Sequence, residues 1–413
     1  MKQRVDISKD RIRLEGAGAG LVRTAGVAAV VGLGASFGLG VLDSAAFLRA
    51  YVLNYTFVVS LALGALFFVI IQHLTRAGWS VVVRRLAEQI SMALPVLAVL
   101  ALPIVILMWL GLEGVHAVYP WTDQHLVGQD PILAAKRPYL NVGFFTLRLA
   151  GYLVLWVLMA GYFYRTSVRQ DETGEVELTS RMQARSAPAI IVFGLTLTFF
   201  SFDLLMSLDP YWFSTIFGVY YFSGSAVGFF ALLALVMIWL QQAGRISHVI
   251  QVDHYHDVGK LMFAFVVFWA YIAFSQYMLI WYGNIPEETT WYVVRQQGLW
   301  LAVSLVLLFG HFIVPFVALM SRHPKRRPQL LKWGAWWVLA MHWCDMFYLT
   351  MPHAEHLTGA PAGFGPLDAV QCVASLIGIG GAATWAVLRR MEQAALIPCR
   401  DPRLGESLEF ENI

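Results

Sequence analysis

The sequence predicts an all-α polytopic membrane protein with about ten transmembrane helices. Of its 413 residues, 58% are hydrophobic and only 13% are charged, whereas charged residues make up about a quarter of a typical soluble domain. Apolar stretches of about 20 residues, enough to cross a bilayer as a helix, recur along the whole chain. A third observation is that the basic residues collect in alternate loops, as membrane topology requires.

Ten stretches fit such a helix. They lie at 21–42, 54–74, 91–112, 139–164, 187–208, 213–240, 259–282, 292–320, 330–351 and 365–388. In the first, Gly34 and Gly38 predict a close helix contact, because small residues let two helices approach. Between the second and third, GWSVVVRRLAEQISMAL is amphipathic, and Trp79, Arg84 and Arg85 predict that this segment lies at the membrane surface.

The basic residues predict that both termini are cytoplasmic. With the N-terminus inside, nearly all of the 29 Lys and Arg residues fall in inner segments. The exceptions are Arg49, Lys136, Arg137, Arg148 and Arg295. This asymmetry is what the positive-inside rule describes. It also explains the run RHPKRRP as a topological signal, so no nucleic-acid partner is predicted.

An internal repeat indicates how the helices are grouped. In FFSFDLLMSLDPYWF and HWCDMFYLTMP, Asp203 and Asp345 each precede a proline by seven positions. The two acids lie four spans apart and share an orientation, which predicts two parallel four-helix bundles and two peripheral helices. The expected parts are a cytoplasmic tail (1–20), a peripheral helix with an outer loop (21–53), a first bundle (54–208), a second bundle (209–351), an outer loop with the other peripheral helix (352–388) and a cytoplasmic tail (389–413).

Polar residues within the apolar stretches are the candidate functional residues, because a charge in hydrocarbon costs at least ~2.5 kcal/mol and usually marks a pathway. Arg148 and Asp203 lie at similar depth, so we expect them to pair, either as a structural ion pair or as part of a function. His342 and Asp345 share a helical face, and His311 lies at the depth of His342. These five residues are the candidates for a transmembrane proton path.

Other chemistry is less well supported by the residues. The two histidines leave open axial ligation of a haem, or simple hydrogen bonding to neighbouring carbonyls. Cys344, Cys372 and Cys399 form no CxxC pair, and an iron–sulfur cluster usually takes four thiolates. We therefore predict no metal site and no catalytic residue. The loops are also too short to fold as a cofactor-binding domain, so any redox centre outside the membrane belongs to another chain.

Two segments, FDLLMSLDPYWFSTIFGVYYFSG and QYMLIWYGNIPEETTWY, resemble the F-type subunits of bacterial alternative complex III, within the NrfD/polysulfide-reductase-like membrane family. The resemblance covers nearly all of the ten-helix length and implies two four-helix bundles in a bacterial inner membrane. Such complexes oxidise quinol and reduce a cytochrome c or a copper protein. The implied partners are a multihaem cytochrome c, an iron–sulfur subunit related to molybdopterin oxidoreductases, a paralogous NrfD-like membrane subunit, a monohaem cytochrome, small membrane subunits and the lipid bilayer.

By this resemblance the chain is an integral subunit without its own redox centre, and the haems and iron–sulfur clusters belong to its partners. Quinone binding by this chain is left open, and no quinone-binding residue is assigned. The proton-path residues come from their depth in the sequence, not from the family. Two alternatives remain: a proton-coupled secondary transporter with its site between the bundles, and a purely structural membrane anchor.

Overall fold

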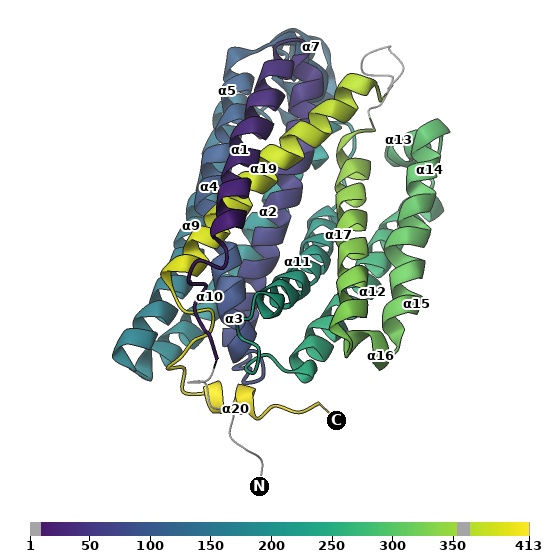
Figure 1. The fold of residues 1–413 in the computed structure, drawn as a ribbon. Helices are drawn as coiled ribbons and strands as arrows, with labels where there is room; N and C mark the ends of the chain where they lie inside the picture. Colours follow the sequence, from purple (N-terminus) through teal and green to yellow (C-terminus); the bar gives the residue numbers. More distant parts are fainter. Residues whose placement is uncertain (1–9, 353–363, 413) are drawn as a thin grey trace.

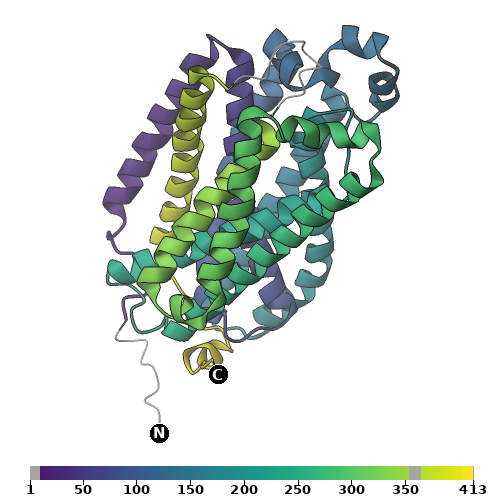
Figure 2. The ribbon, with the colours of Figure 1, turned by 90° about the vertical axis from the view of Figure 1, so that its right-hand side faces the viewer.

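The computed structural model, which describes residues 10–352 and 364–412, confirms an all-α membrane protein. Within these residues there is no strand, and nine helical segments are long and apolar enough to cross a bilayer. They run side by side, with short helices at both ends (Figure 1, Figure 2).

The nine segments are α1 (Ala19–Gly40), α2 (Ser44–Leu74), α3 to α5 (Val81–Ser91, Leu94–Leu100, Leu102–Leu110), α9 (Val142–Thr173), α10 with η3 (Glu177–Leu204, Met206–Leu208), α11 (Phe217–Gln242), α12 (Val252–Gly283), α14 to α15 (Gly298–Val306, the π-helix η4 at Leu307–Ile313, Val314–Met320) and α19 (Pro366–Gln393). The short helices are α6 (Glu113–Val118), η2 (Pro120–Thr122), α7 (Gln124–Gln129), α8 (Pro131–Lys136), α13 (Pro286–Arg295), α16 (Arg322–Lys325) and α20 (Leu404–Leu408).

Helix α17 (Pro328–Thr350) covers the span predicted at 330–351, but it is not one of the nine described segments that are apolar enough to cross a bilayer. Its tryptophans together with His342 and Asp345 lower its mean hydropathy. Both ends of the described chain lie at the same end of the molecule (Figure 1), where the N–H of Leu396 donates to the carbonyl of Ile12 at 2.7 Å. A tenth crossing by α17 stays a prediction.

Two predicted spans are interrupted. The stretch expected at 292–320 is divided between α13 and the segment α14 to α15, and Gly298, the first residue of α14, has a φ of +50°, which favours glycine. The third span breaks at Ala101 between α4 and α5, next to Pro103, which lacks the N–H that a continuous helix needs. Residues 1–9 and 413 of the predicted tails and 353–363 of the predicted outer loop lie outside the described residues.

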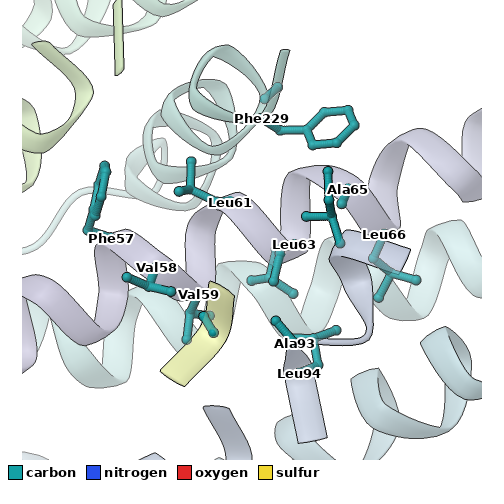
Figure 3. Close-up of a cluster of buried hydrophobic side chains, with 14 of the residues drawn as sticks. Phe57, Val58, Val59, Leu61, Leu63, Ala65, Leu66, Ala93, Leu94 and Phe229 are labelled. Atoms are coloured by element: carbon teal, nitrogen blue, oxygen red, sulfur yellow. The ribbon is translucent and has the colours of Figure 1, made fainter. Parts of the chain in front are cut away.

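Helix α2 forms the centre of the core and is buried on nearly every side. Figure 3 shows its apolar side chains between Phe229 of α11 and Leu94 of α4. A Cβ on Gly64 would lie 2.4 Å from the carbonyl oxygen of Ser225, so only glycine allows α2 and α11 to approach this closely. Because α2 also contacts α10, α17 and α19, it touches both expected bundles. The division at residue 208 stays a prediction.

Helices α1 and α19 pack against each other as a pair, as both views show (Figure 1, Figure 2). The close contact uses Gly32 of α1 and Gly378 of α19, where an added Cβ would lie 2.4 Å from the opposite backbone nitrogen. The prediction that Gly34 and Gly38 make this contact is wrong, since no described atom lies within 4 Å of a Cβ at either position. Gly34 and Gly38 lie on the side of α1 that faces away from α19. Their spacing in the sequence does not reveal which side of α1 packs against another helix.

The segment containing Arg84 and Arg85, which the sequence places at the membrane surface, is covered by protein; its depth relative to the membrane stays a prediction. Every residue of α3 is buried, and both guanidinium groups form ion pairs with Glu88. Arg84 also pairs with Asp401 of the C-terminal segment, and Arg85 pairs with Asp171 of α9 at 2.9 Å. The amphipathic face therefore packs against protein, because the C-terminal segment and α9 supply acids and cover it.

Candidate functional site

Arg148 and Asp203 form the ion pair that the sequence predicts. The Nε of Arg148 donates to Oδ2 of Asp203 at 2.9 Å, and its Nη2 donates to Oδ1 at 2.8 Å. Helix α9 places Arg148 opposite α10, whose last turn carries the fully buried Asp203. The Oη of Tyr152 donates to the same carboxylate at 3.0 Å. This two-point contact is the strong form of an arginine–carboxylate pair.

The surroundings of Arg148 hold its charge in place. Its Nη1 donates to the carbonyl of Tyr139 at 2.9 Å, and the guanidinium lies over the rings of Tyr139 and Phe144 at 3.8 and 4.4 Å. Cation–π contacts of this kind favour a desolvated guanidinium. Both charges are thus compensated, and the arrangement favours the structural reading of this pair.

Asp345 has a different environment, although it occupies the corresponding place in the repeat. Its carboxyl is fully buried and accepts hydrogen bonds from the Oη of Tyr220 at 2.5 Å and from the Nε1 of Trp269 at 3.1 Å. Both donors are neutral, and no described Lys, Arg or His forms an ion pair with this carboxyl. A charge on Asp345 is therefore not offset by an opposite charge, which makes the group a candidate for taking up and releasing a proton.

The ring of His342, one turn earlier on α17, is held by Ser60 of α2. The hydroxyl oxygen of Ser60 lies 2.6 Å from the carbonyl oxygen of Phe57 and 2.8 Å from Nε2 of His342. When Ser60 donates to Phe57, Nε2 donates to Ser60 and Nδ1 carries the lone pair. The Nδ1 atom has no hydrogen-bond partner among the described residues.

The free nitrogen of His342 and the carboxyl of Asp345 face a common space beside α11. A Cβ added to Gly224 would lie 3.1 Å from Nδ1 of His342 and 3.5 Å from Oδ2 of Asp345. On the next turn, a Cβ on Gly228 would lie 2.5 Å from Cδ2 of His342. Because both positions are glycine, the imidazole of His342 can lie directly against α11. Nδ1 of His342 and the carboxyl of Asp345 both lie close to Gly224.

His311 joins this group through Trp269. The two rings stack with centroids 4.0 Å apart, while Trp269 donates to Asp345 with its indole nitrogen. His311 lies in the π-helix η4, where the indole of Trp337 donates to the carbonyl of Gly310 at 2.7 Å. Segments of π-helix often occur at functional sites. No hydrogen bond to either ring nitrogen of His311 occurs in the described part of the chain.

The five predicted residues therefore fall into two groups. Arg148 and Asp203 pair at α9 and α10, while His311, His342 and Asp345 gather at α12, α14–α15 and α17. No described hydrogen bond or ion pair connects the two groups. A continuous path through all five residues is thus not present in the described contacts.

Sequence analysis missed several residues that shape the second group, namely Ser60, Tyr220, Gly224, Gly228 and Trp269. One signal was available, because Gly224 and Gly228 form a GxxxG motif in SGSAVGFF, typical of close helix contacts. The other three are ordinary membrane-helix residues, and nothing in their local sequence indicates a role.

A buried arginine fixes the C-terminal end of α17. The guanidinium of Arg295 donates to the carbonyls of Trp291, Tyr348 and Leu349 at 3.0 to 3.4 Å and stacks on the Trp291 ring at 3.4 Å. Burial lowers the pKa of Arg295 to about 10. A cation near the last carbonyls of a helix is favourable. This contact holds the helix that carries His342 and Asp345.

A cavity of about 420 Å³ lies at the end of the molecule where α8 and α13 are found, next to the Arg148–Asp203 pair. Its wall includes Lys136, Tyr139, Asp209, Trp212 and Phe213. The Nζ of Lys136 donates to the carbonyl of Pro210 at 2.5 Å, and burial lowers the pKa of this lysine. The cavity thus combines aromatic walls with a few polar groups, as ligand sites do.

Metal binding has no support in the described residues, where no group of three or more His, Cys, Asp and Glu side chains could hold an ion. For the haem alternative, Nε2 of His342 contacts Ser60, whereas Nδ1 has no hydrogen-bond partner among the described residues. An iron at Nε2 would therefore have to replace the contact with Ser60.

No protein-family model matches the chain, and no curated protein matches it either. The fold class and the two polar groups are therefore the observations on which a functional proposal rests.

Proposed function

We propose that the chain is an integral subunit of a quinol-oxidising respiratory complex in a bacterial inner membrane, and that Asp345 and His342 form its proton-transfer site. The observation that carries the proposal is the buried carboxyl of Asp345, bound only by neutral donors and facing the free Nδ1 of His342 beside Gly224. Ionisable groups inside a membrane protein that lack an opposite charge are typical of proton relays.

The chemistry of the site follows from its geometry. Nδ1 of His342 and the carboxyl of Asp345 both lie close to Gly224, so the imidazole is the base that exchanges a proton with Asp345 in this proposal. His342 can accept at Nδ1 while keeping its Nε2 bond to Ser60. Tyr220 and Trp269 keep the carboxyl oriented during this exchange. The ring of His311 stacks on the ring of Trp269 and adds a third ionisable side chain to this group, contributed by the segment α14 to α15.

The link to quinol oxidation is supported by the resemblance of the two sequence segments to F-type subunits. Oxidation of a quinol releases two protons with two electrons. In this proposal, partner chains with haems and iron–sulfur clusters carry the electrons, and this subunit moves protons. Arg148 and Asp203 act as a structural pair that locks α9 to α10.

A second candidate function is quinone binding by this chain. It is favoured by the 420 Å³ cavity, whose size lies in the ligand range of about 300–1,000 Å³ and whose walls combine Trp212 and Phe213 with Lys136 and Asp209. Photolabelling of the purified complex with an azidoquinone tests it. Label in the peptide spanning 202–213 is expected, and label confined to other subunits would contradict quinone binding here.

The assignment to a respiratory complex is tested by affinity purification from native membranes in mild detergent, with mass spectrometry and a haem spectrum. We expect a multihaem cytochrome c, an iron–sulfur subunit and a second NrfD-like membrane chain to co-purify. Recovery of the chain alone and without haem would overturn the assignment. Proton-coupled transport would then be the leading alternative, to be tested by substrate uptake into vesicles.

A further inference from the structure

Helices α1 and α19 form a groove of about 560 Å³ on the surface of the helix assembly. At the end nearest the chain termini the groove is lined by Arg23, Arg389 and Glu392, and further along α1 by Val27 and Val30. The two helices lie side by side, in front of the other helices in Figure 1 and along the left edge of the molecule in Figure 2. The groove therefore joins a charged end to an apolar channel.

The charged end has an excess of positive charge. Arg23 is exposed and forms no ion pair with any described residue. Arg389 pairs with Glu392 at 3.3 Å, and its guanidinium lies over the ring of Trp385 at 5.9 Å. Two guanidinium groups thus face a single carboxylate in this groove. Basic pockets between transmembrane helices, close to the membrane surface, are typical binding places for anionic lipid head groups.

The apolar part has the length and exposure that a lipid chain requires. Val27, Val30 and Val31 are 56%, 75% and 62% exposed. Because they lie in a helix that is apolar enough to cross the membrane, these side chains are open to contact with lipid chains. The Trp385 ring lies against α1 at Gly26, where an added Cβ would be in ordinary van der Waals contact with the ring at 3.4 Å. The eight helical steps from Arg23 to Val31 rise about 12 Å, comparable with the roughly 15 Å of one hydrocarbon leaflet.

We propose that this groove binds one anionic phospholipid, with its phosphate between Arg23 and Arg389 and one acyl chain along Val27 and Val30. The unpaired charge of Arg23 selects the anionic head group, and the valines and Trp385 hold the chain. The site is independent of any proton or quinone chemistry in the rest of the protein, because it lies on the peripheral helix pair.

The test uses the full chain, purified with its native partners and depleted of lipid, and native mass spectrometry after titration with phosphatidylglycerol or phosphatidylcholine. One tightly retained phosphatidylglycerol is expected, with weaker retention of phosphatidylcholine. The double variant Arg23→Gln, Arg389→Gln is expected to lower the affinity for phosphatidylglycerol about 30-fold, from roughly a fivefold effect per arginine near the surface. The matched control removes two exposed arginines outside the groove, Arg169→Gln with Arg181→Gln, and should retain the lipid.

A second variant tests the apolar part without changing any charge. Val30→Trp fills the groove beside the exposed Val30 side chain and is expected to reduce retention of the same lipid. Equal retention by the groove variants and the control would overturn the proposal. Equal affinity for the two lipids, or occupation of the groove by a cross-linked protein segment, would overturn it as well.

Discussion

Replacing the carboxylate of Asp203 is expected to destabilise the protein strongly, because its partner stays behind as an uncompensated charge. Asp203 is fully buried and the side chain of Arg148 is only 10% exposed. In Asp203→Asn, Arg148 loses the opposite charge and one of its two hydrogen bonds at 2.8 and 2.9 Å; a hydrogen bond to a charged group is worth about 1.5–3 kcal/mol. Breaking a buried pair on one side typically costs about 3–5 kcal/mol, which is the loss we expect in the free energy of unfolding.

The measurement is SDS-induced unfolding of the purified chain in mild detergent, followed by tryptophan fluorescence. The double variant Arg148→Met, Asp203→Leu removes both charges and is expected to lie within about 1 kcal/mol of the wild type, because apolar residues often replace a buried pair at little cost. Arg181→Gln, which disrupts an exposed pair with Glu177, serves as the control and should change stability by less than about 1 kcal/mol. A double variant as unstable as the sum of its single variants would refute this reasoning.

Three further predictions concern the ends of the helix assembly. Arg295→Gln should cost about 2–3 kcal/mol in the same assay, since buried carbonyls at the end of α17 lose a charged donor. Asp401→Asn should make the C-terminal segment more susceptible to limited proteolysis, because Arg84 then keeps only its contact with Glu88. The hydrogen bond from Tyr211 lowers the pKa of Asp130. This contact stabilises the folded state above the unfolded pKa of about 3.9 and loses its effect as the pH falls through the lower folded value. The stability difference between Tyr211→Phe and wild type should therefore shrink on acidification, as pH-dependent unfolding can measure.

The fold class and one ion pair could be predicted because both depend on local and one-dimensional information. Apolar stretches give the helices, and the depth of a residue along a span follows from its distance to the loop. That is why Arg148 and Asp203 could be paired, and why His311 could be placed level with His342. The structure confirms the first pairing directly and brings His311 near Asp345 through Trp269.

The remaining contacts of the candidate residues could not be predicted, because they depend on which faces of distant helices meet. Ser60 lies 282 residues from His342, and no local pattern links them. The difference between Asp203 and Asp345 is likewise invisible in their similar motifs, because it results from an arginine on one neighbouring helix and neutral donors on others. The burial of Arg84 is hidden from local sequence for the same reason, since its partner Asp401 lies near the far end of the chain.

The most direct test of the account is quinol-driven proton release by the purified complex in proteoliposomes, comparing Asp345→Asn and Gly224→Ala with wild type. Gly224→Ala changes no titratable group but places a methyl 2.9 Å from Cε1 of His342, in the space shared with Asp345. The exposed Glu177→Gln is the control. Loss of positioned proton transfer lowers rates by about 10²-fold or more, so both variants should assemble normally and release protons at about 1% of the wild-type rate. Unchanged proton release in Asp345→Asn would contradict the central claim.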